Sequence, residues 1–572
     1  MQKIKLLCTL LLVVLLISCN TEKQTISLNG NWYFLASNSL TEAEVFKTHF
    51  SEWDTLSVPG NWDTSDKYAE FVGKGYYQRT INVPSNWDNK QIRLKFDAVY
   101  QTAKVWLNGE LLGTHVGGYT PFEFNITKLV DAGNAYQLVV QADNTYKRGA
   151  WWAWGGISRN VALVANNDVR IMYQHIDAIP DFENNSLTIN VKYKLENNAT
   201  EVQNVSILSS VNDGGNSKEE YQKEISIKGN STAFHQYVIQ AKLSDYQLWE
   251  LDHPYLYRLS SKIKHNGTVL DYKDDKFGVR KIEAIGEQLF FNNRPIKMDG
   301  INRVHDHPEY GNTEPDILVK SDIMDMKALG TSFSRMMHAP LAPNLLNFCD
   351  SVGYLIIEEI PVWGDDDPQS FPNNPQTKKW MQELITRDYN HPCVVGWSVG
   401  NELRDSIAPW GAKSLTTEQY GYVNSMLDYV GSLDSTRLKT YVSITAYGKH
   451  TDMSNEPYDK LDLICINSYG DAIRNTELTH EKFPNKPIFL SEIGLKQIGG
   501  GADAELDEKL INYIKTIKEY PYVVGLSLWC YNDYRSNYKG TPESGFREWG
   551  VVDELRNKKK AYWQLKEVFA RD

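Results

Sequence analysis

The chain has 572 residues, of which 41% are hydrophobic, and a formal net charge of −12. This length is too great for one ordinary core and predicts three domains, one large and two smaller. Acidic and basic residues are mixed along the chain without a basic patch, which argues against nucleic acid as a partner.

Residues 1–19 have the pattern of an export signal. Lys3 and Lys5 precede the apolar run 6–17, which is shorter than the roughly 20 apolar residues of a membrane-spanning helix. Residues 16–19 resemble a bacterial lipobox, and this resemblance implies that Cys19 becomes the lipidated first residue of the mature chain. We therefore expect an exported protein, in the periplasm or at the cell surface, whose only link to the membrane is a lipid anchor on Cys19. A plain secretory signal that ends near a cysteine is the alternative.

Residues 20–170 have the pattern of short strands separated by turn residues, with examples at 76–83, 92–99 and 104–113. In the third of these, Asn108-Gly109 stands between two alternating apolar runs, which is a strong signal for a two-residue hairpin. The pattern predicts an all-β jelly roll.

Residues 171–283 continue with strand patterns separated by turns rich in Asn and Gly. In segment 186–195 every second residue is apolar, which describes one buried sheet face: Leu187, Ile189, Val191, Tyr193 and Leu195. A second and smaller sandwich of immunoglobulin-like size fits this stretch.

From residue 284 to 572, apolar runs alternate with helical patterns, which is typical of a (β/α)8 TIM barrel. The segment 416–433 has the apolar spacing of an outer helix. Eight candidate strands are present, as a closed barrel requires: 296–302, 331–337, 354–360, 394–400, 439–444, 462–467, 487–491 and 523–529.

Two glutamates follow the apolar runs of two of these strands. Glu402 comes after the fourth strand and Glu492 after the seventh, 90 residues later. The carboxyl ends of barrel strands meet at one rim, where TIM-barrel enzymes place their reacting groups. A pair of carboxyl groups in one mouth is what glycoside hydrolysis requires.

Motifs in all three predicted domains carry a resemblance to a known family. They are GGISR at 155–159, LWELDHPYLY at 248–257, FGVRKI at 277–282, GINR at 300–303, SRMMH at 334–338, EEIPVWG at 358–364, the two glutamate motifs, and DLICINSY at 462–469. With these motifs the chain resembles glycoside hydrolase family 2, the β-galactosidase and β-glucuronidase family, over essentially all of its mature length. The resemblance implies a retaining glycosidase that needs no cofactor.

Carried over residue by residue, the resemblance makes Glu402 the general acid/base and Glu492 the nucleophile. It implies that Asn401 hydrogen-bonds the sugar 2-hydroxyl and that the hydroxyl of Tyr469 orients the nucleophile. These roles fit a retaining mechanism, in which one carboxyl group is protonated and the other ionised. For Tyr469 the alternative is an aromatic ring that packs at a strand end.

The resemblance also implies a sugar subsite around these groups. Arg335 and His338 would line the subsite and support the nucleophile electrostatically, and Trp529 would form the floor on which the sugar ring stacks, with Asp533 nearby. Glu359 would contact sugar hydroxyls or bind a neighbouring arginine. A lone histidine is more often structural, but the Arg-x-x-His spacing within a matching motif favours a functional role for His338.

The chain departs from the family pattern in two places. Family β-galactosidases commonly have Asn-Arg-His at the end of the first barrel strand, whereas residues 302–304 are Asn-Arg-Val, followed by His-Asp-His at 305–307. No third and fourth ligands stand at metal-site spacing, so we predict no required metal there. The Asn-x-Lys hallmark of glucuronidases is absent, and the aligned residues 547–549 are Arg-Glu-Trp. Arg547 can still supply a forked donor to a carboxylate or sulfate.

The sequence thus predicts an exo-β-glycosidase that removes terminal β-galactosides from oligosaccharides. A β-glucuronidase-type hydrolase of acidic algal or plant glycans is the alternative, and a carbohydrate-binding protein without turnover is a second alternative from another class. The sequence leaves open which terminal sugar is bound and whether the chain forms a homo-oligomer. We expect the remaining cysteines of the mature chain to be buried free thiols: Cys349, Cys393, Cys465 and Cys530.

Overall fold

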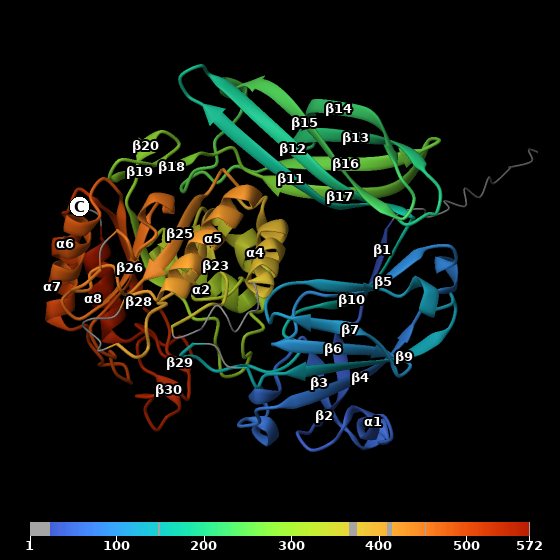
Figure 1. Ribbon diagram of the computed structural model, residues 1–572. Coiled ribbons are helices and arrows are strands. Elements are labelled where there is room, and N and C mark those ends of the chain that lie inside the picture. Colours follow the sequence, from blue (N-terminus) through green and yellow to red (C-terminus); the bar gives the residue numbers. More distant parts are fainter. Residues whose placement is uncertain (1–22, 147–148, 365–373, 409–413, 452, 571–572) are drawn as a thin grey trace, which may run out of the picture.

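The computed structural model describes residues 23–570 except 147–148, 365–373, 409–413 and 452. The predicted export signal, with Cys19, lies outside the described residues. Three units follow one another along the chain, from blue to red in Figure 1. In the part of the chain that is described, no helix has the length and apolar character needed to cross a bilayer.

The first unit is a sandwich of two antiparallel sheets with strand orders β1-β10-β5-β8 and β3-β2-β4-β9-β6-β7. Asn108 and Gly109 join β6 to β7 with φ angles of 48° and 83°, as the predicted hairpin requires. A short helix, α1 (Glu42–Val45), lies outside the sheets. The strands are β1 (Gln24–Ser27), β2 (Gly30–Ala36), β3 (Asp54–Val58), β4 (Lys74–Asn82), β5 (Gln91–Phe96), β6 (Thr102–Leu107), β7 (Glu110–Val116), β8 (Phe122–Asn125), β9 (Ala135–Asp143) and β10 (Val161–Asn166).

The second unit is a smaller sandwich with sheets β11-β12-β15 and β14-β13-β16-β17. The five alternating apolar residues of segment 186–195 all have fully buried side chains on one face of β12. The strands are β11 (Val169–Asp181), β12 (Ser186–Asn197), β13 (Gln203–Asp213), β14 (Asn216–Ile227), β15 (Ser231–Lys242), β16 (Tyr257–His265) and β17 (Thr268–Phe277).

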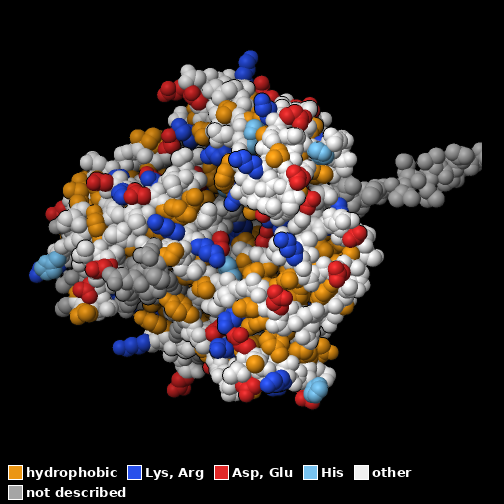
Figure 2. Space-filling view, turned by 45° about the vertical axis from the view of Figure 1, so that its right-hand side comes forward, with side chains coloured by type: hydrophobic (Ala, Val, Ile, Leu, Met, Phe, Trp, Pro, Cys, Tyr) orange, Lys and Arg blue, Asp and Glu red, His pale blue; other side chains and the backbone are white. Residues whose placement is uncertain are grey.

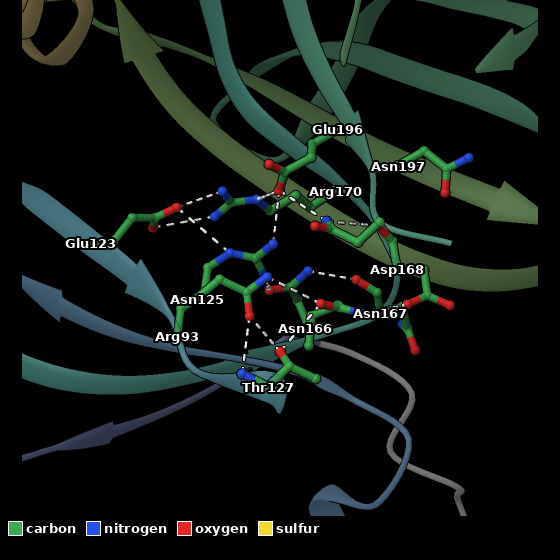
Figure 3. A network of polar contacts seen from close by, with 12 residues as sticks. Arg93, Glu123, Asn125, Thr127, Asn166, Asn167, Asp168, Arg170, Glu196 and Asn197 are labelled. Carbon is green, nitrogen blue, oxygen red and sulfur yellow. Dashed lines mark hydrogen bonds and ion pairs between the residues drawn. The ribbon is translucent and has the colours of Figure 1, made fainter. Parts of the chain in front are cut away.

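A network of charged side chains joins these two units (Figure 3). Arg93 of β5 is almost fully buried and its Nη2 lies 2.8 Å from Glu196 of β12. Arg170 of β11 is 2.7 Å from Glu196 and 2.5 Å from Glu123 of β8. Because removal of one partner would leave a buried charge unpaired, this network fixes how the two sandwiches meet.

The third unit is a closed barrel of eight parallel strands in the order β21 to β28. Each of the eight predicted strands is present, so the predicted fold class of jelly roll, immunoglobulin-like sandwich and (β/α)8 barrel is confirmed. The barrel strands are β21 (Met298–Asn302), β22 (Phe333–Ser334), β23 (Leu355–Glu359), β24 (Val394–Asn401), β25 (Leu438–Ser443), β26 (Ile464–Tyr469), β27 (Ile488–Gly494) and β28 (Val523–Trp529).

Helices cover the outside of the barrel. The predicted helix at 416–433 is α5, and Thr416 caps it with a reciprocal capping box to Gln419. The helices are α2 (Asp316–Ala328), α3 (Pro343–Val352), α4 (Pro375–Asp388), α5 (Thr417–Leu433), α6 (Ala472–Lys482), α7 (Glu508–Lys518) and α8 (Lys560–Phe569). Two small sheets flank the barrel in sequence, β18 (Ile282–Ile285), β19 (Gln288–Phe291) and β20 (Arg294–Pro295) before it, and β29 (Tyr534–Arg535) with β30 (Phe546–Arg547) after it.

The surface carries charges of both signs. Figure 2 shows acidic and basic side chains interspersed over the visible face, without a broad region of one sign. The four cysteines expected as buried free thiols are buried and free.

Candidate active site

A cavity of about 340 Å³ opens at the carboxyl ends of the barrel strands. Its size lies in the range of small-molecule sites, and aromatic side chains dominate its wall. Glu402 and Glu492 both face this cavity, so the two predicted carboxyl groups converge on one space. The lining residues are Ala150, Trp151, Met337, His338, Trp363, Glu402, Arg404, Ile444, Tyr469, Glu492, Trp529, Tyr534, Tyr538, Arg547 and Trp549.

Glu492 lies within β27 and is held at both carboxylate oxygens. Its Oε1 accepts from Nη2 of Arg335, and its Oε2 accepts from the hydroxyl of Tyr469. Nε2 of His338 is 3.8 Å from the same Oε1. Both contacts favour the ionised form of Glu492 and fix the orientation of its carboxyl group.

Glu402 directly follows β24 in a different environment. Its backbone is in the left-handed region, with φ of 55°, and its N–H donates to the carbonyl of Val442 at 2.8 Å. Its Oε1 accepts from Nδ2 of Asn467 at 2.9 Å, and its Oε2 is 3.7 Å from Nη1 of Arg404. The strand end therefore turns the Glu402 carboxyl group into the cavity, where its ion-pair partner Arg404 lies farther away than Arg335 does from Glu492.

Burial raises the pKa of both carboxyl groups, and their neighbours differ. Desolvation raises the pKa of Glu402, and Asn467 and Arg404 oppose this rise. Desolvation raises the pKa of Glu492 to about 8, a rise that Arg335 and Tyr469 oppose and to which the charge of Glu402 adds. A close pair of buried carboxyl groups holds one proton between them. Because Arg335 contacts Glu492, we assign the charge to Glu492 and the proton to Glu402.

Arg335 and His338 form a buried support behind Glu492. Nη1 of Arg335 donates to Glu359 at 3.0 Å, and Nδ1 of His338 is 2.9 Å from the same oxygen. Burial opposes ionisation of Glu359, but Arg335 and His338 together lower its pKa. Desolvation lowers the pKa of His338 to about 4, so its ring is neutral near pH 7.

The wall of the cavity is aromatic around His338. The ring of Trp529 stacks on His338 with centroids 5.9 Å apart, and Trp151 of the first unit packs on it at 5.3 Å. Flat aromatic faces of this kind suit the C–H faces of a sugar ring. Trp529 is therefore where the sequence predicts it, in the wall of the cavity.

Arg547 lines the cavity, Asn401 is fully buried directly before Glu402, and each has a donor without a partner among the described residues. In the described part of the chain, Nδ2 of Asn401 and Nε of Arg547 are buried without a hydrogen-bond partner. Oδ1 of Asn401 accepts from Asn467 at 3.1 Å, which fixes the amide so that Nδ2 is the donor left over. A buried donor without a partner marks a place where a ligand atom can bind.

Four predicted site residues do not line the cavity. Asn401 and Arg335 are fully buried beside it, with Asn401 next to Glu402 in the chain and Arg335 in contact with Glu492. Asp533 accepts from Nζ of Lys559 at 2.7 Å and from the N–H of Gly550 at 2.7 Å, so its carboxylate is already occupied. Glu359 is fully buried beneath Arg335, and of the two roles considered for it the structure places it in the arginine-binding one. Glu359 therefore supports the site from behind through Arg335 and His338.

The structure adds site residues that the sequence did not single out. Asn467 lies inside the DLICINSY motif, and Arg404 stands two residues after Glu402, so each had a neighbouring signal. Trp151 comes from the first unit, and nothing in its local sequence indicates that it reaches the barrel. Further wall residues come from segments that follow barrel strands β23, β25 and β28: Trp363, Ile444, Tyr534, Tyr538 and Trp549.

In the His-Asp-His cluster at 305–307, Asp306 accepts from donors in other parts of the chain. Oδ2 of Asp306 accepts from Nε1 of Trp154 at 2.6 Å, and its Oδ1 accepts from the N–H of Arg535 at 3.2 Å. Desolvation lowers the pKa of His305 to about 4. The expectation that no metal is required here stays a prediction.

Three family models match successive parts of the chain. The sugar binding domain of glycosyl hydrolases family 2 matches residues 66–167, the model described as glycosyl hydrolases family 2 matches 169–280, and the TIM barrel domain of the same family matches 282–561. The three matches follow the order of the two sandwiches and the barrel.

Curated relatives divide between two activities. The beta-galactosidase of Thermoanaerobacter pseudethanolicus is 32% identical over 401 residues, which cover 66% of this chain and 51% of that protein. The beta-galactosidase BoGH2A of Bacteroides ovatus is 26% identical over 509 residues, covering 81% and 58%. The beta-glucuronidase of Rattus norvegicus is 27% identical over 617 residues, covering 95% and 90%. The chain thus spans less than two thirds of the two bacterial relatives.

Solved structures share the fold. A beta-glucuronidase of Bacteroides uniformis superposes with a TM-score of 0.83 at 24% identity, covering 96% of this chain and 70% of that one. A beta-galacturonidase of Eisenbergiella tayi, solved with bound galacturonate, superposes with a TM-score of 0.81 at 22% identity, covering 96% and 97%.

Proposed function

Because the chain belongs to glycoside hydrolase family 2, we propose that it hydrolyses β-glycosides with retention and releases one terminal sugar at a time. The observation that carries this proposal is that Glu402 and Glu492 face one cavity in different environments. One carboxyl group is set up to hold a proton and the other to hold a charge, which is the division that double displacement needs.

In the first step, the Glu492 carboxylate attacks the anomeric carbon while Glu402 donates its proton to the departing glycosidic oxygen. A bond forms between Glu492 and the sugar as the bond to the leaving group breaks. The free Nδ2 of Asn401 is available to donate to the sugar 2-hydroxyl, a contact that strengthens as charge develops on the ring.

In the second step, the Glu402 carboxylate takes a proton from water, and the water oxygen attacks the anomeric carbon. The bond to Glu492 breaks, its electron pair returns to the carboxylate, and the sugar leaves with its original configuration. Arg335 and Tyr469 hold Glu492 in place and stabilise its charge each time it is released.

The hydroxyl of Tyr469 gives a testable pH effect. A hydrogen bond donated to a carboxylate favours its charged form, so loss of that bond raises the pKa of Glu492. We expect Tyr469→Phe to move the acid limb of kcat/KM to higher pH and to lower kcat by about 10- to 100-fold. The pH dependence of kcat/KM checks this. Tyr354→Phe is the matched control, because Tyr354 hydrogen-bonds Phe333 inside the barrel, outside the cavity lining. An acid limb that stays in place would contradict the role of Tyr469.

For the sugar itself, we propose a terminal β-galactoside as the first candidate. The two bacterial relatives with this activity support it, as does a compact cavity with an aromatic wall, which suits a single ring at the end of a chain. The departure from the Asn-x-Lys pattern at residues 547–549 weighs against simple glucuronate recognition.

A terminal uronide is the second candidate, and Arg547 favours it. In the described residues its guanidinium has no carboxylate partner, its Nη1 makes a long contact of 3.4 Å to the carbonyl of Lys539, and the rings of Tyr538 and Trp549 flank it. A guanidinium at the cavity wall that is held between two rings and has no carboxylate partner can bind a carboxylate of the substrate with two parallel hydrogen bonds.

A panel of nitrophenyl β-glycosides decides between the two candidates. The first candidate predicts the highest kcat/KM on the β-galactoside, with little effect of Arg547→Leu. The second predicts the highest value on the β-galacturonide or β-glucuronide, and a loss of about 10- to 100-fold in Arg547→Leu. A protein that binds these sugars but releases no nitrophenol from any of them would be a carbohydrate-binding protein, and the proposed function would be wrong.

The setting of the activity stays a prediction from the sequence. Export and lipid anchoring depend on Cys19, which lies outside the described residues. An anchored enzyme of this kind would act on oligosaccharides outside the cytoplasm.

A further inference from the structure

A loop of the first unit reaches into the barrel and forms part of the cavity wall. Ala150 and Trp151 line the cavity, although they come from a sandwich that ends long before the first barrel strand. Trp151 is 4% exposed and packs against His338, the neutral ring beside Glu492. The position of this loop therefore affects both the sugar subsite and the support of Glu492.

Two carboxylates hold the tryptophans that follow Trp151. On the side of the first unit, Asp63 accepts from Nε1 of Trp152 at 2.8 Å and from the N–H of Gly155 at 2.6 Å. On the side of the barrel, Asp306 accepts from Nε1 of Trp154 at 2.6 Å. All of these groups are buried, so each hydrogen bond is costly to lose.

Arg535 of β29 connects the two sides. Its guanidinium carbon lies 3.9 Å from the ring centroid of Trp152 and 5.4 Å from that of Trp154, as cation–π contacts require. Its Nη2 donates to the carbonyl of Ala69 at 2.7 Å, and its own N–H donates to Asp306. The β29–β30 hairpin lies on the side of the barrel that faces the first unit (Figure 1).

Backbone contacts extend the same attachment to the wall residues themselves. The N–H of Trp152 donates to the carbonyl of Arg535 at 2.9 Å, and Oγ of Ser536 donates to the carbonyl of Ala150 at 2.6 Å. Ala150 and Trp152 are thus tied to the barrel on both sides of Trp151. This leaves Trp151 little freedom to move away from His338.

We propose that Asp63, Asp306 and Arg535, together with Trp152 and Trp154, form a tryptophan clamp whose function is to position Trp151 as a wall of the sugar subsite. The proposal rests on the proposed function and deepens it, because it makes the first unit a part of the active site instead of a separate binding module. It also assigns a positioning role to Asp306 of the His-Asp-His cluster.

The test compares two isosteric changes at the contact between the first unit and the barrel. Asp306→Asn replaces one of the two oxygens that accept from Trp154 and Arg535 with an NH2 group and removes the negative charge. Glu383→Gln is the matched control, because Glu383 of α4 accepts from Oγ1 of Thr120 at 2.6 Å across the same contact but does not line the cavity. Trp154→Phe is a second clamp variant, which removes the N–H donor to Asp306 and leaves a smaller aromatic ring.

We expect Asp306→Asn and Trp154→Phe to lower kcat/KM by about 10- to 100-fold, mainly through a higher KM, because a displaced wall weakens sugar binding. Glu383→Gln should keep kcat/KM within about threefold of wild type, since Glu383 does not line the cavity and changes at distant, independent positions seldom alter a site. Assays run well below the melting temperature of each variant separate this effect from a loss of folded protein. Wild-type kinetics in both clamp variants, or an equal loss in Glu383→Gln, would overturn the proposal.

A second measurement separates this proposal from the proposed function. If wild type releases no nitrophenol from any glycoside, the proposed function fails. The clamp can then be tested by the rate of amide hydrogen exchange at residues 149–156. Faster exchange in Asp306→Asn than in Glu383→Gln would support the clamp. Equal exchange in the two variants would contradict it.

Discussion

We expect Glu492→Gln to lose turnover by roughly 10⁴- to 10⁶-fold on every glycoside that wild type accepts. The amide has the same shape as the carboxylate, but it cannot attack the anomeric carbon, so no covalent intermediate forms. The backbone of β27 and the cavity stay in place, and sugar binding should therefore change far less than turnover. Initial rates with nitrophenyl glycosides, together with the affinity for the released sugar, check both parts.

Glu456→Gln is the matched control for this loss. Glu456 is also buried, its Oε1 accepts from Ser443 at 3.1 Å, and desolvation raises its pKa to about 7, but it does not line the cavity. Its replacement should leave kcat within about threefold of wild type at temperatures where the variant is folded. A Glu492→Gln variant that keeps more than a hundredth of wild-type activity would rule out Glu492 as the nucleophile.

The second large effect is expected for Glu402→Ala, and it depends on the leaving group. A sugar or other poor leaving group needs the proton from Glu402, so kcat/KM should fall by about 10²- to 10⁴-fold. A dinitrophenolate leaves without a proton, so its release should be nearly unaffected in the first step. Hydrolysis of the intermediate still needs the base, and a burst of dinitrophenol followed by slow turnover should appear.

Azide and pH provide the controls for Glu402. Azide attacks without a general base, so it should restore turnover of the variant and yield a β-glycosyl azide. In wild type the proton on Glu402 is needed for the first step, and burial raises the pKa of Glu402, so activity should persist above the ordinary glutamate range and fall when this proton is lost. The variant should lack this basic limb. An unchanged basic limb in Glu402→Ala would assign the proton to another group.

Much of the fold could be predicted because it repeats simple patterns. The alternation of apolar and polar residues in segment 186–195 and the Asn-Gly turn at 108–109 depend only on neighbouring residues. Both appear in the structure as predicted. The eight barrel strands are apolar because they are buried on both faces, so length and composition are sufficient to find them. The convergence of Glu402 and Glu492 follows from the same rule, because both come at strand ends.

The parts of the site that could not be predicted depend on contacts between distant segments. Trp151 lines the cavity because the first unit is tied to β29, and no local pattern encodes that contact. Asp533 follows the last barrel strand as a substrate-binding residue would, but Lys559, 26 residues later, occupies its carboxylate. A residue's position on the rim indicates that it can reach the cavity. Its partners decide whether it does.

The most direct test of the double displacement is to trap the covalent intermediate. A 2-deoxy-2-fluoro glycoside of the accepted sugar, with a dinitrophenyl leaving group, slows both steps but slows hydrolysis of the intermediate enough for it to accumulate. Peptide mass spectrometry of the inactivated protein should then find one fluorosugar on Glu492, and none in Glu492→Gln. A label on any other residue, or continued turnover without a label, would contradict the mechanism.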